Sequence, residues 1–214
     1  MNRVLVASSN PGKLADFAEA ARAHNLEVLP LPGIKQIQSP EETGATFEEN
    51  ARLKAEFYSR HSSQNILIAD DSGLVVAALG GEPGVRSARY AEDNGIVVPD
   101  PDAANNRLLL ERAEKISDAH RQCAFVCAIA AARDGHVLQI FTGEARGTLL
   151  RAPRGSNGFG YDPLFYFPDL KKSFAELSRV EKLAVSHRGA AFRMFLQWMD
   201  AQVGRRSRVP AERD

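Results

Sequence analysis

The sequence predicts an α/β or α+β fold in which helices pack on a sheet. Apolar runs typical of buried strands are interspersed with segments of helical periodicity, and two of these segments begin with a capping-box pattern. We find no internal repeat, and no stretch rich in Gly, Ser or Pro that would separate domains. A mixed order of strands and helices is typical of layered folds of this class.

The first half of the chain contains three expected strands and two expected helices. RVLVAS near the N-terminus predicts a strand, and apolar residues then recur at helical spacing from Leu14 to Ala21. LEVLPLP predicts a short second strand that its prolines stop. The capping box T-F-E-E starts a helix at Thr46 that runs to about Arg60, and ILIA predicts a central strand after it.

The second half continues with shorter signals. LVVAALGG is a further apolar segment, and the Pro- and Asp-rich stretch VVPDPDAANN introduces a helix around Leu108 to Lys115. Residues 122–132 and 136–142 flank an Arg-Asp-Gly turn, which predicts a hairpin.

The C-terminal region contains two helix starts. Ser178 opens the second capping box, and Ser186 is expected to cap the last helix. We expect the apolar side of this helix to carry Ala190, Ala191, Met194, Phe195, Trp198 and Met199. Residues 205–214 lack apolar periodicity and are expected to form a flexible basic tail.

The composition is that of an ordinary soluble protein, with 44% hydrophobic and 25% charged residues in a chain of 214. Lys plus Arg and Asp plus Glu both number 27, which disfavours a dedicated nucleic-acid binder. The sequence shows neither a signal-peptide pattern nor an apolar stretch that would span a bilayer. Cys123 and Cys127 do not have zinc-ribbon spacing, so we expect buried, reduced thiols in a cytosolic protein.

Two aspartates, Asp70 and Asp71, follow directly on the apolar run ILIA. In an extended chain successive side chains point to opposite faces, so only one of the two can face a given site. An unpaired carboxylate at the end of a buried strand is costly, so a metal or hydrogen-bond donors should lie close. We therefore expect one aspartate to do chemistry and the other to support it.

The polar segment SSNPGK lies between the first strand and the first helix. Backbone N–H groups at a helix N-terminus, with a lysine and short polar side chains, can hold phosphate oxygens. The candidates are Ser8, Ser9, Asn10, Pro11, Gly12 and Lys13. The segment lacks the outer residues of a Walker A loop, and a plain surface turn is the alternative.

Asn50 and Lys54 interrupt the apolar arc of the helix that starts at Thr46. A lysine in that position either extends out to solvent or points into a polar cleft with an anionic partner. Glu41 and Glu42 precede this helix in the loop SPEETG. Such acid pairs are usually solvated, but beside a strand-end aspartate one of them could hold Mg²⁺, which prefers oxygen ligands.

The segment GSNGFGYDPLF has the permissive backbone that close approach of a ligand requires, and Phe159 and Tyr161 supply flat surfaces. A structural turn with core aromatics is the alternative. Lys182, His187 and Arg188 cluster before the last helix, where the helix dipole disfavours cations. Their placement suggests an external anionic partner, although exposed basic residues often need none.

Taken together, these segments resemble the inosine triphosphate pyrophosphatase family, also called Ham1-like or non-canonical purine NTP pyrophosphatases. The resemblance runs in order through SSNPGK, EETGATFEENARLKA, ADDSGLVVAALGGEPGVRSARYA, GSNGFGYDPLF and ELSRVEKLAVSHRG, and bacterial members are most similar. It implies an α/β fold with an elongated mixed sheet flooring a cleft between two lobes, as one domain over residues 1–204. It also implies a cytoplasmic homodimer and Mg²⁺-dependent hydrolysis of ITP, dITP and XTP to the monophosphate and pyrophosphate.

The resemblance further implies roles for individual residues. Asp71 is the expected catalytic proton acceptor and, with Glu41, the expected metal ligand, whereas Glu42 is a weaker match. The expected triphosphate contacts are Ser8, Asn10, Lys13 and Lys54, and Ser72 is an expected substrate contact. The expected nucleoside-side contacts are Phe159, Gly160, Tyr161, Asp162, Lys182, His187 and Arg188. The visible departure is Ser8-Ser9, where bacterial relatives often have Thr-Gly, and it preserves a hydroxyl at position 8.

Two other functions stay open at this point. Maf-like pyrophosphatases share the general fold and the α–β cleavage but act on other nucleotides, and the motifs SHRG and FGYD argue against them. A non-catalytic nucleotide-binding module is disfavoured by the neutral net charge and by the paired acids, which repel phosphate without a metal. We expect no nucleic-acid partner and no membrane partner.

Overall fold

A seven-stranded mixed sheet forms the centre of the computed structural model, which describes residues 2–24, 26–62 and 64–206. Its strand order is β2-β1-β3-β4-β5-β6-β7. The strands are β1 (Asn2–Val6), β2 (Leu26–Pro30), β3 (Ile66–Val76), β4 (Gln122–Arg133), β5 (His136–Leu149), β6 (Phe165–Phe167) and β7 (Lys172–Ser173). β1 is parallel to β2 and to β3, and every later neighbouring pair is antiparallel.

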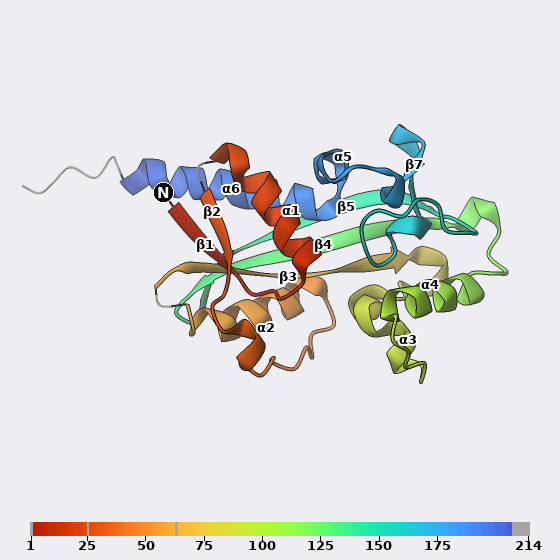
Figure 1. The fold of residues 1–214 in the computed structure, drawn as a ribbon, viewed down its shortest axis with the longest axis horizontal. Helices are drawn as coiled ribbons and strands as arrows, with labels where there is room; N and C mark the ends of the chain where they lie inside the picture. Colours follow the sequence, from red (N-terminus) through yellow and green to blue (C-terminus); the bar gives the residue numbers. More distant parts are fainter. Residues whose placement is uncertain (1, 25, 63, 207–214) are drawn as a thin grey trace, which may run out of the picture.

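Six α-helices within these described ranges cover the sheet. They are α1 (Pro11–Ala21), α2 (Phe47–Ser59), α3 (Tyr90–Asp93), α4 (Pro101–Arg112), α5 (Arg179–Val185) and α6 (His187–Arg206). Figure 1 shows α1 and α6 on one side of the long strands and α2 on the other. The long strands β3, β4 and β5 connect this end of the molecule to a second end, where α3, α4, α5 and β7 lie. The expected elongated mixed sheet is therefore confirmed.

Small side chains allow α2 to pack closely on the sheet. Three consecutive residues of β4 on this face, Ala128, Ala130 and Ala132, lie in one buried cluster with Ala51 and Ala55 of α2. The opposite face of β4 carries larger residues such as Ile129, which pack with aromatic residues of α1 and α6. The alternation of a strand thus gives α2 and the α1–α6 pair different kinds of packing surface.

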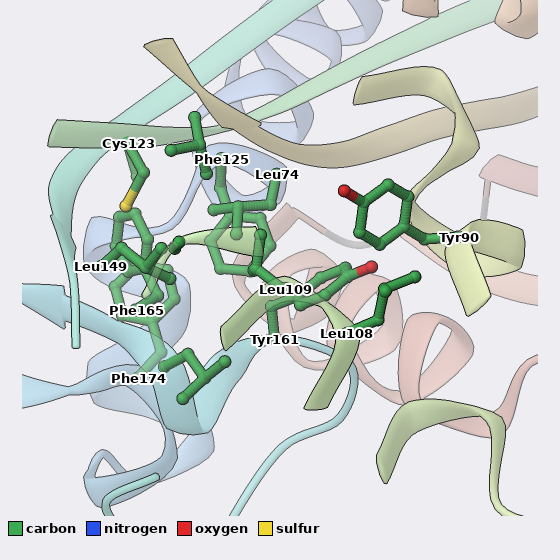
Figure 2. Packing of buried hydrophobic residues seen from close by; sticks show 14 of the residues in the cluster. Leu74, Tyr90, Leu108, Leu109, Cys123, Phe125, Leu149, Tyr161, Phe165 and Phe174 are labelled. Carbon is green, nitrogen blue, oxygen red and sulfur yellow. The ribbon is translucent and has the colours of Figure 1, made fainter. Parts of the chain in front are cut away.

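A second core fills the other end of the molecule. Figure 2 shows Leu74 and Phe125 of the sheet packed with Leu109 of α4 and with Phe165 and Phe174. The ring centroids of Phe125 and Phe165 lie 4.8 Å apart. These contacts connect the C-terminal half of β3 to the segment that follows the glycine-rich loop.

Most expected elements are confirmed, with three differences in extent. β3 runs without interruption through both aspartates, so ILIA and the first part of LVVAALGG are one strand. β5 continues to Leu149 because it pairs with β4 as far as Thr148 and with β6 at Thr148 and Leu149. The helix expected around Leu108 to Lys115 runs instead from Pro101 to Arg112. It begins at Pro101 because the Asp100 side chain caps it by accepting a hydrogen bond from the N–H of Ala103 (3.0 Å).

The last helix is confirmed, but one residue of its expected apolar side is wrong. Ser186 caps it by accepting a hydrogen bond from the N–H of Gly189 (3.1 Å). Met194 is 43% exposed, whereas Phe192 and Leu196 are buried, because the face that meets the sheet is rotated from the one expected. The helix continues to Arg206, and residues 207–214 of the expected tail lie outside the described residues.

Both cysteines are free and buried in β4, as expected. In the ranges that the structure describes, no helix is both long enough and apolar enough to cross a membrane.

Candidate active site

The candidate site lies where β1 ends and β3 continues with β4 on one side and, in the described part of the chain, no strand on the other. β1 pairs with β3 only along Val4–Val6, and the N–H of Ala7 donates the last hydrogen bond to the carbonyl of Ile68 (2.8 Å). From Asp70 to Gly73 the described residues provide no strand on that side of β3. Side chains from both faces of β3 therefore gather around this open edge.

Asp71 lies on the α2 face of β3. The Nζ atom of Lys54 donates to its Oδ1 (2.7 Å), and the side-chain amide of Asn50 donates to its Oδ2 (3.4 Å). The same Lys54 Nζ lies 3.1 Å from Oε1 of Glu42. The two polar residues in the apolar arc of α2 thus point into a polar cleft with anionic partners, and the alternative of a lysine that extends to solvent is excluded.

Burial and charge act against each other on this pair. Burial raises the pKa of Asp71 above its ordinary value and outweighs the opposing effect of Lys54. Burial lowers the pKa of Lys54, but the carboxylates of Asp71, Asp70 and Glu42 outweigh it and hold that pKa above its ordinary value. Asp71 is therefore a stronger base than an exposed aspartate, and its lysine partner remains a cation.

Asp70 lies on the opposite face, as strand alternation predicts. Its Oδ2 lies 2.9 Å from Nζ of Lys13 and 3.5 Å from Nη2 of Arg188, and it is 4% exposed. Burial raises its pKa, but Lys13, Arg188 and Lys54 outweigh this effect and hold the pKa well below its usual range. Asp70 is thus a fixed anion that holds two of the cations expected to bind substrate.

The segment Ser8–Lys13 forms the expected turn into a helix. The Asn10 side chain caps α1 by accepting hydrogen bonds from the N–H groups of Gly12 (2.8 Å) and Lys13 (3.2 Å). The Ser8 hydroxyl accepts a hydrogen bond from the N–H of Asn10 (3.2 Å), and Pro11 occupies the first turn. Because Asn10 already satisfies the two N–H groups, the ammonium of Lys13 is the segment's main group for an anionic ligand.

Two adjoining depressions meet at the two lysines. A cavity of about 230 Å³ contains Asp71, Ser72 and the aromatic loop. A more open hollow of about 670 Å³ contains Ser8 and Ser9. Both are lined by Asn10, Lys13, Glu42, Lys54 and Ala88. An elongated ligand with an aromatic group at one end and anionic groups at the other fits this arrangement.

Hydrogen bonds hold the aromatic loop in place at the cavity. The Asp162 carboxylate accepts from the N–H of Phe159 (2.9 Å) and pairs closely with the Lys182 ammonium. Helix α4 also holds this loop, because the carboxylate of its residue Asp102 accepts a hydrogen bond from the N–H of Gly160 (2.7 Å). Lys182 Nζ lies 4.9 Å from the centroid of the Phe159 ring. Tyr161 is buried, and its hydroxyl donates to the carbonyl of Ser87 (2.8 Å).

His187 and Arg188 reach the cavity because α6 starts close to the sheet. At Gly143 of β5, a Cβ atom would lie 2.2 Å from the His187 carbonyl oxygen, so only glycine allows this approach. The His187 ring stacks on Phe125 at 4.7 Å, and the Arg188 Nη2 donates to the Ser72 hydroxyl (2.9 Å). His187 Nδ1 and Arg188 Nε are buried and have no partner among the described residues.

The two loop glutamates differ in position. Glu41 is exposed, and Glu42 is the one beside Lys54 and Asp71. Among the residues that the structure describes, no group of three or more His, Cys, Asp or Glu side chains could hold a metal by itself.

Several residues that line the cavity were not singled out from the sequence. Those that bring charged or amide groups are Arg89, Asp102 and Asn105. Arg89 and Asp102 lie in polar segments whose spacing resembles that of ordinary surface residues, so no sequence signal distinguishes them. Asn105 interrupts an apolar helix face much as Asn50 does, and that signal could have found it.

A model of the Ham1 family matches residues 4–198 of the chain. The chain belongs to the Ham1 family. A dITP/XTP pyrophosphatase of Acidobacterium capsulatum is 53% identical over 194 residues, which cover 89% of this chain and 95% of that protein. A dITP/XTP pyrophosphatase of Bacillus anthracis is 46% identical, with 90% and 94% covered. The structure of a HAM1 protein from Coxiella burnetii matches this Ham1 family member with a TM-score of 0.80 and 39% identity, over 94% and 100% of the two chains.

Proposed function

We propose that this Ham1 family member hydrolyses dITP, ITP and XTP to the nucleoside monophosphate and pyrophosphate, which removes these nucleotides from the nucleotide pool. The relatives named dITP/XTP pyrophosphatase support this substrate class. The observation that carries the proposal is the buried Asp71 carboxylate, which lines the cavity and lies 2.7 Å from Lys54, a residue that lines both the cavity and the hollow. A Maf-like base preference and a non-catalytic binding module are the alternatives.

In this proposal the nucleotide lies along both depressions. The base occupies the cavity beside Phe159 and Arg188, and the phosphates extend past Lys13 and Lys54 toward the hydroxyl of Ser8. Aromatic rings bind flat bases through their faces. Ammonium groups bind phosphate oxygens through charge-assisted hydrogen bonds.

The residues then divide the chemical work. Asp71 orients a water molecule and takes its proton as the water oxygen bonds to the α-phosphorus. The bond from the α-phosphorus to the bridging oxygen breaks, and pyrophosphate leaves with that oxygen. Lys13 and Lys54 stabilise the charge that develops on the leaving group, because phosphoryl-type transfer depends mainly on positioning and electrostatics.

Magnesium is part of the proposal, and the donor set fits it. Oxygens of Asp71 and Glu42 both contact Nζ of Lys54, so two carboxylates converge on one cation position. Asp71 would hold Mg²⁺ with Glu42, or with Glu41 as the sequence predicts. Substrate phosphates and water would supply the remaining oxygens. When bound, the ion would neutralise charge on the phosphates.

Base selection has a simple chemical basis in this proposal. The guanidinium of Arg188 has only hydrogen-bond donors. It can donate to the 6-oxo group of hypoxanthine or xanthine, but it finds no acceptor in the 6-amino group of adenine. Arg188 lines the cavity, and its guanidinium carbon lies 5.4 Å from the centroid of the Phe159 ring, beside the proposed position of the base. Sites of this kind discriminate strongly, because the wrong base leaves buried polar groups unpaired.

We also propose that the protein acts in the cytoplasm as a homodimer, with residues 1–204 as one functional domain. Neither nucleic acid nor a membrane is part of the proposal. The zero formal net charge supports the exclusion of nucleic acid.

Product analysis tests this function directly. Purified protein is incubated with Mg²⁺ and ITP, XTP, GTP or ATP in parallel, and the products are separated by ion-exchange chromatography. We expect IMP and XMP with pyrophosphate, and little conversion of ATP or GTP. IDP with inorganic phosphate would contradict the position of the attacking water, and turnover of ATP alone would contradict the base selection.

A further inference from the structure

Arg89 lines the cavity but has no role in the function proposed above. We propose that Arg89 binds a phosphate group of the purine triphosphate, from the side opposite to Lys54. This inference rests on the proposed function, because the phosphate belongs to the substrate proposed there. It adds a binding residue that comes from the short helical segment η4 (Gly84–Arg89).

The backbone around Arg89 is fixed directly on β3. At Gly73 a Cβ atom would lie 2.2 Å from the Ser87 Oγ, so η4 packs against the bare backbone of the strand. The Ser87 hydroxyl accepts a hydrogen bond from the N–H of Leu74 (2.9 Å) and donates to the carbonyl of Gly84 (2.6 Å). Arg89 therefore begins from a well-held position beside the cavity.

Glu42 lies between Arg89 and Lys54. Its Oε2 accepts a hydrogen bond from Nη2 of Arg89 (2.8 Å), and its Oε1 lies 3.1 Å from Nζ of Lys54. A guanidinium has five N–H donors, and among the described residues Glu42 is the one hydrogen-bond partner of Arg89. With its side chain 38% exposed, Arg89 has donors left for a second oxyanion.

The position of this ion pair relates it to the path of the ligand. Glu42, the partner of Arg89, lines both the cavity and the hollow, as Lys54 does, so Glu42 lies at their junction. Arg89 lies beside it and lines the cavity. A nucleotide that fills both depressions has to place a phosphate near this point. The Glu42 carboxylate is a planar oxyanion, and a phosphate presents the same pairs of oxygens that arginine binds in a bidentate manner.

The same segment supplies a matched control. Arg86, three residues earlier in η4, donates two hydrogen bonds to the Asp93 carboxylate (2.5 and 2.6 Å). Arg86 is absent from the residues that line the cavity. The two arginines share charge and secondary structure and differ in access to the ligand.

The experiment compares wild type with R89Q, R89K and R86Q in binding of a non-hydrolysable ITP analogue with an α,β-imido bridge. Calorimetry at fixed Mg²⁺ gives the dissociation constants. We expect R89Q to weaken binding by about tenfold to a hundredfold, as for a lost charge-assisted contact, and R86Q to change it less than twofold. R89K keeps the positive charge but loses the planar guanidinium that can make two parallel hydrogen bonds to a phosphate, so we expect an intermediate loss of affinity.

Two further readouts separate binding from a structural effect. Inhibition by pyrophosphate should weaken in R89Q in parallel with analogue binding, and the ratio of kcat/KM for ITP and ATP should stay unchanged. Equal analogue binding by R89Q and wild type, or an equal loss in R86Q, would overturn the inference. If R89Q does not fold, the test rests on R89K. Analogue binding by R89K as tight as that of wild type would then overturn the inference. A wild type that binds no purine triphosphate would overturn the proposed function, and this inference with it.

Discussion

Asp70 and Asp71 are neighbours in the chain, yet their carboxylates bind lysines of two different helices on opposite faces of β3. Oδ2 of Asp70 lies 2.9 Å from Nζ of Lys13 in α1, and Oδ1 of Asp71 lies 2.7 Å from Nζ of Lys54 in α2. The Asp71 side chain lines the cavity, whereas that of Asp70 is only 1% exposed. The two carboxylates should therefore separate in experiments that measure turnover and stability independently.

The first prediction concerns turnover. Asp71→Asn removes the proposed proton acceptor but keeps the shape of the side chain. We expect kcat for ITP to fall by about 10² to 10⁴, the usual contribution of general base catalysis. Steady-state pyrophosphate release measures it. Near-normal turnover in this variant, together with a loss in Asp70→Asn, would reverse the assignment of the two acids.

The second prediction concerns stability. Asp70→Asn leaves the buried Arg188 and the half-buried Lys13 with less negative charge, and we expect the free energy of unfolding to fall by about 3 kcal/mol. Urea unfolding measures it. The control is Asp93→Asn, which breaks the more exposed pair with Arg86 and should cost less than about 1 kcal/mol. Equal effects of the two substitutions would argue against the clamping role of Asp70.

The two acids show what sequence reasoning achieved and where it stopped. Strand alternation predicted that Asp70 and Asp71 face opposite sides, because that relationship depends on the local chain alone. Both capping boxes, at Thr46 and Ser178, form as expected for the same reason. The periodicity of α2 also identified Lys54 as misplaced on an apolar face, but only the packing of α2 on β3 shows that its partner is Asp71.

Features that depend on contacts between distant segments were not accessible in this way. The cavity takes Arg89 from η4 and Asp102 from α4, and the chain brings both there only through the packing of α3 and α4 beyond the end of β1. Helix α6 buries Phe192, exposes Met194 and approaches β5 closely at Gly143, and no local pattern encodes this contact between distant segments.

The third prediction concerns base selection. Arg188→Ala should reduce the preference for ITP over ATP by about tenfold or more, because the donor to the 6-oxo group is lost. The ratio of kcat/KM values measures this preference. Arg179→Ala is the matched control. Arg188 and Arg179 each lie 3.6 Å from an oxygen of Asp16, but the Arg179 side chain is 56% exposed and that of Arg188 only 4%. An unchanged ratio in Arg188→Ala would remove Arg188 from the base-binding role.

The fourth prediction concerns the contact between β3 and η4. Gly73→Ala would place a Cβ atom 2.2 Å from the Ser87 hydroxyl, so we expect a loss of about 3 kcal/mol in the free energy of unfolding. Gly80→Ala is the control, because no atom lies within 4 Å of its Cβ and only its φ of +66° is unfavourable, at about 1 kcal/mol. Denaturant unfolding compares them, and a smaller cost at Gly73 than at Gly80 would contradict the close contact.

The fifth prediction concerns pH. Burial, with help from Arg188 and Lys182, holds the pKa of His187 well below its ordinary value of 6.5. The unfolded chain therefore takes up a proton near pH 6.5 that the folded protein does not. The contribution of His187 to the free energy of unfolding should be fully present above pH 6.5. Below that pH it should decrease by about 1.4 kcal/mol for each pH unit.

Urea unfolding between pH 5.5 and 8 measures this slope in wild type, His187→Gln and His136→Gln. We expect the substitution at His187 to reduce the slope and the substitution at His136, an exposed residue of β5, to preserve it. A slope that persists undiminished in His187→Gln would show that other groups cause it.

The open edge of β3 has one further consequence, for the behaviour of the protein in a crowded solution. Unpaired peptide groups along a strand edge can bind a strand of another molecule, and this pairing is a common route to aggregation. From Asp70 to Ser72 that edge is flanked by Asp70, Asp71 and the two lysines that pair with them. Charged side chains in such a position hinder the approach of a foreign strand. The charged residues that we expect to bind the nucleotide should thus also hinder the pairing of this edge with a strand of another molecule.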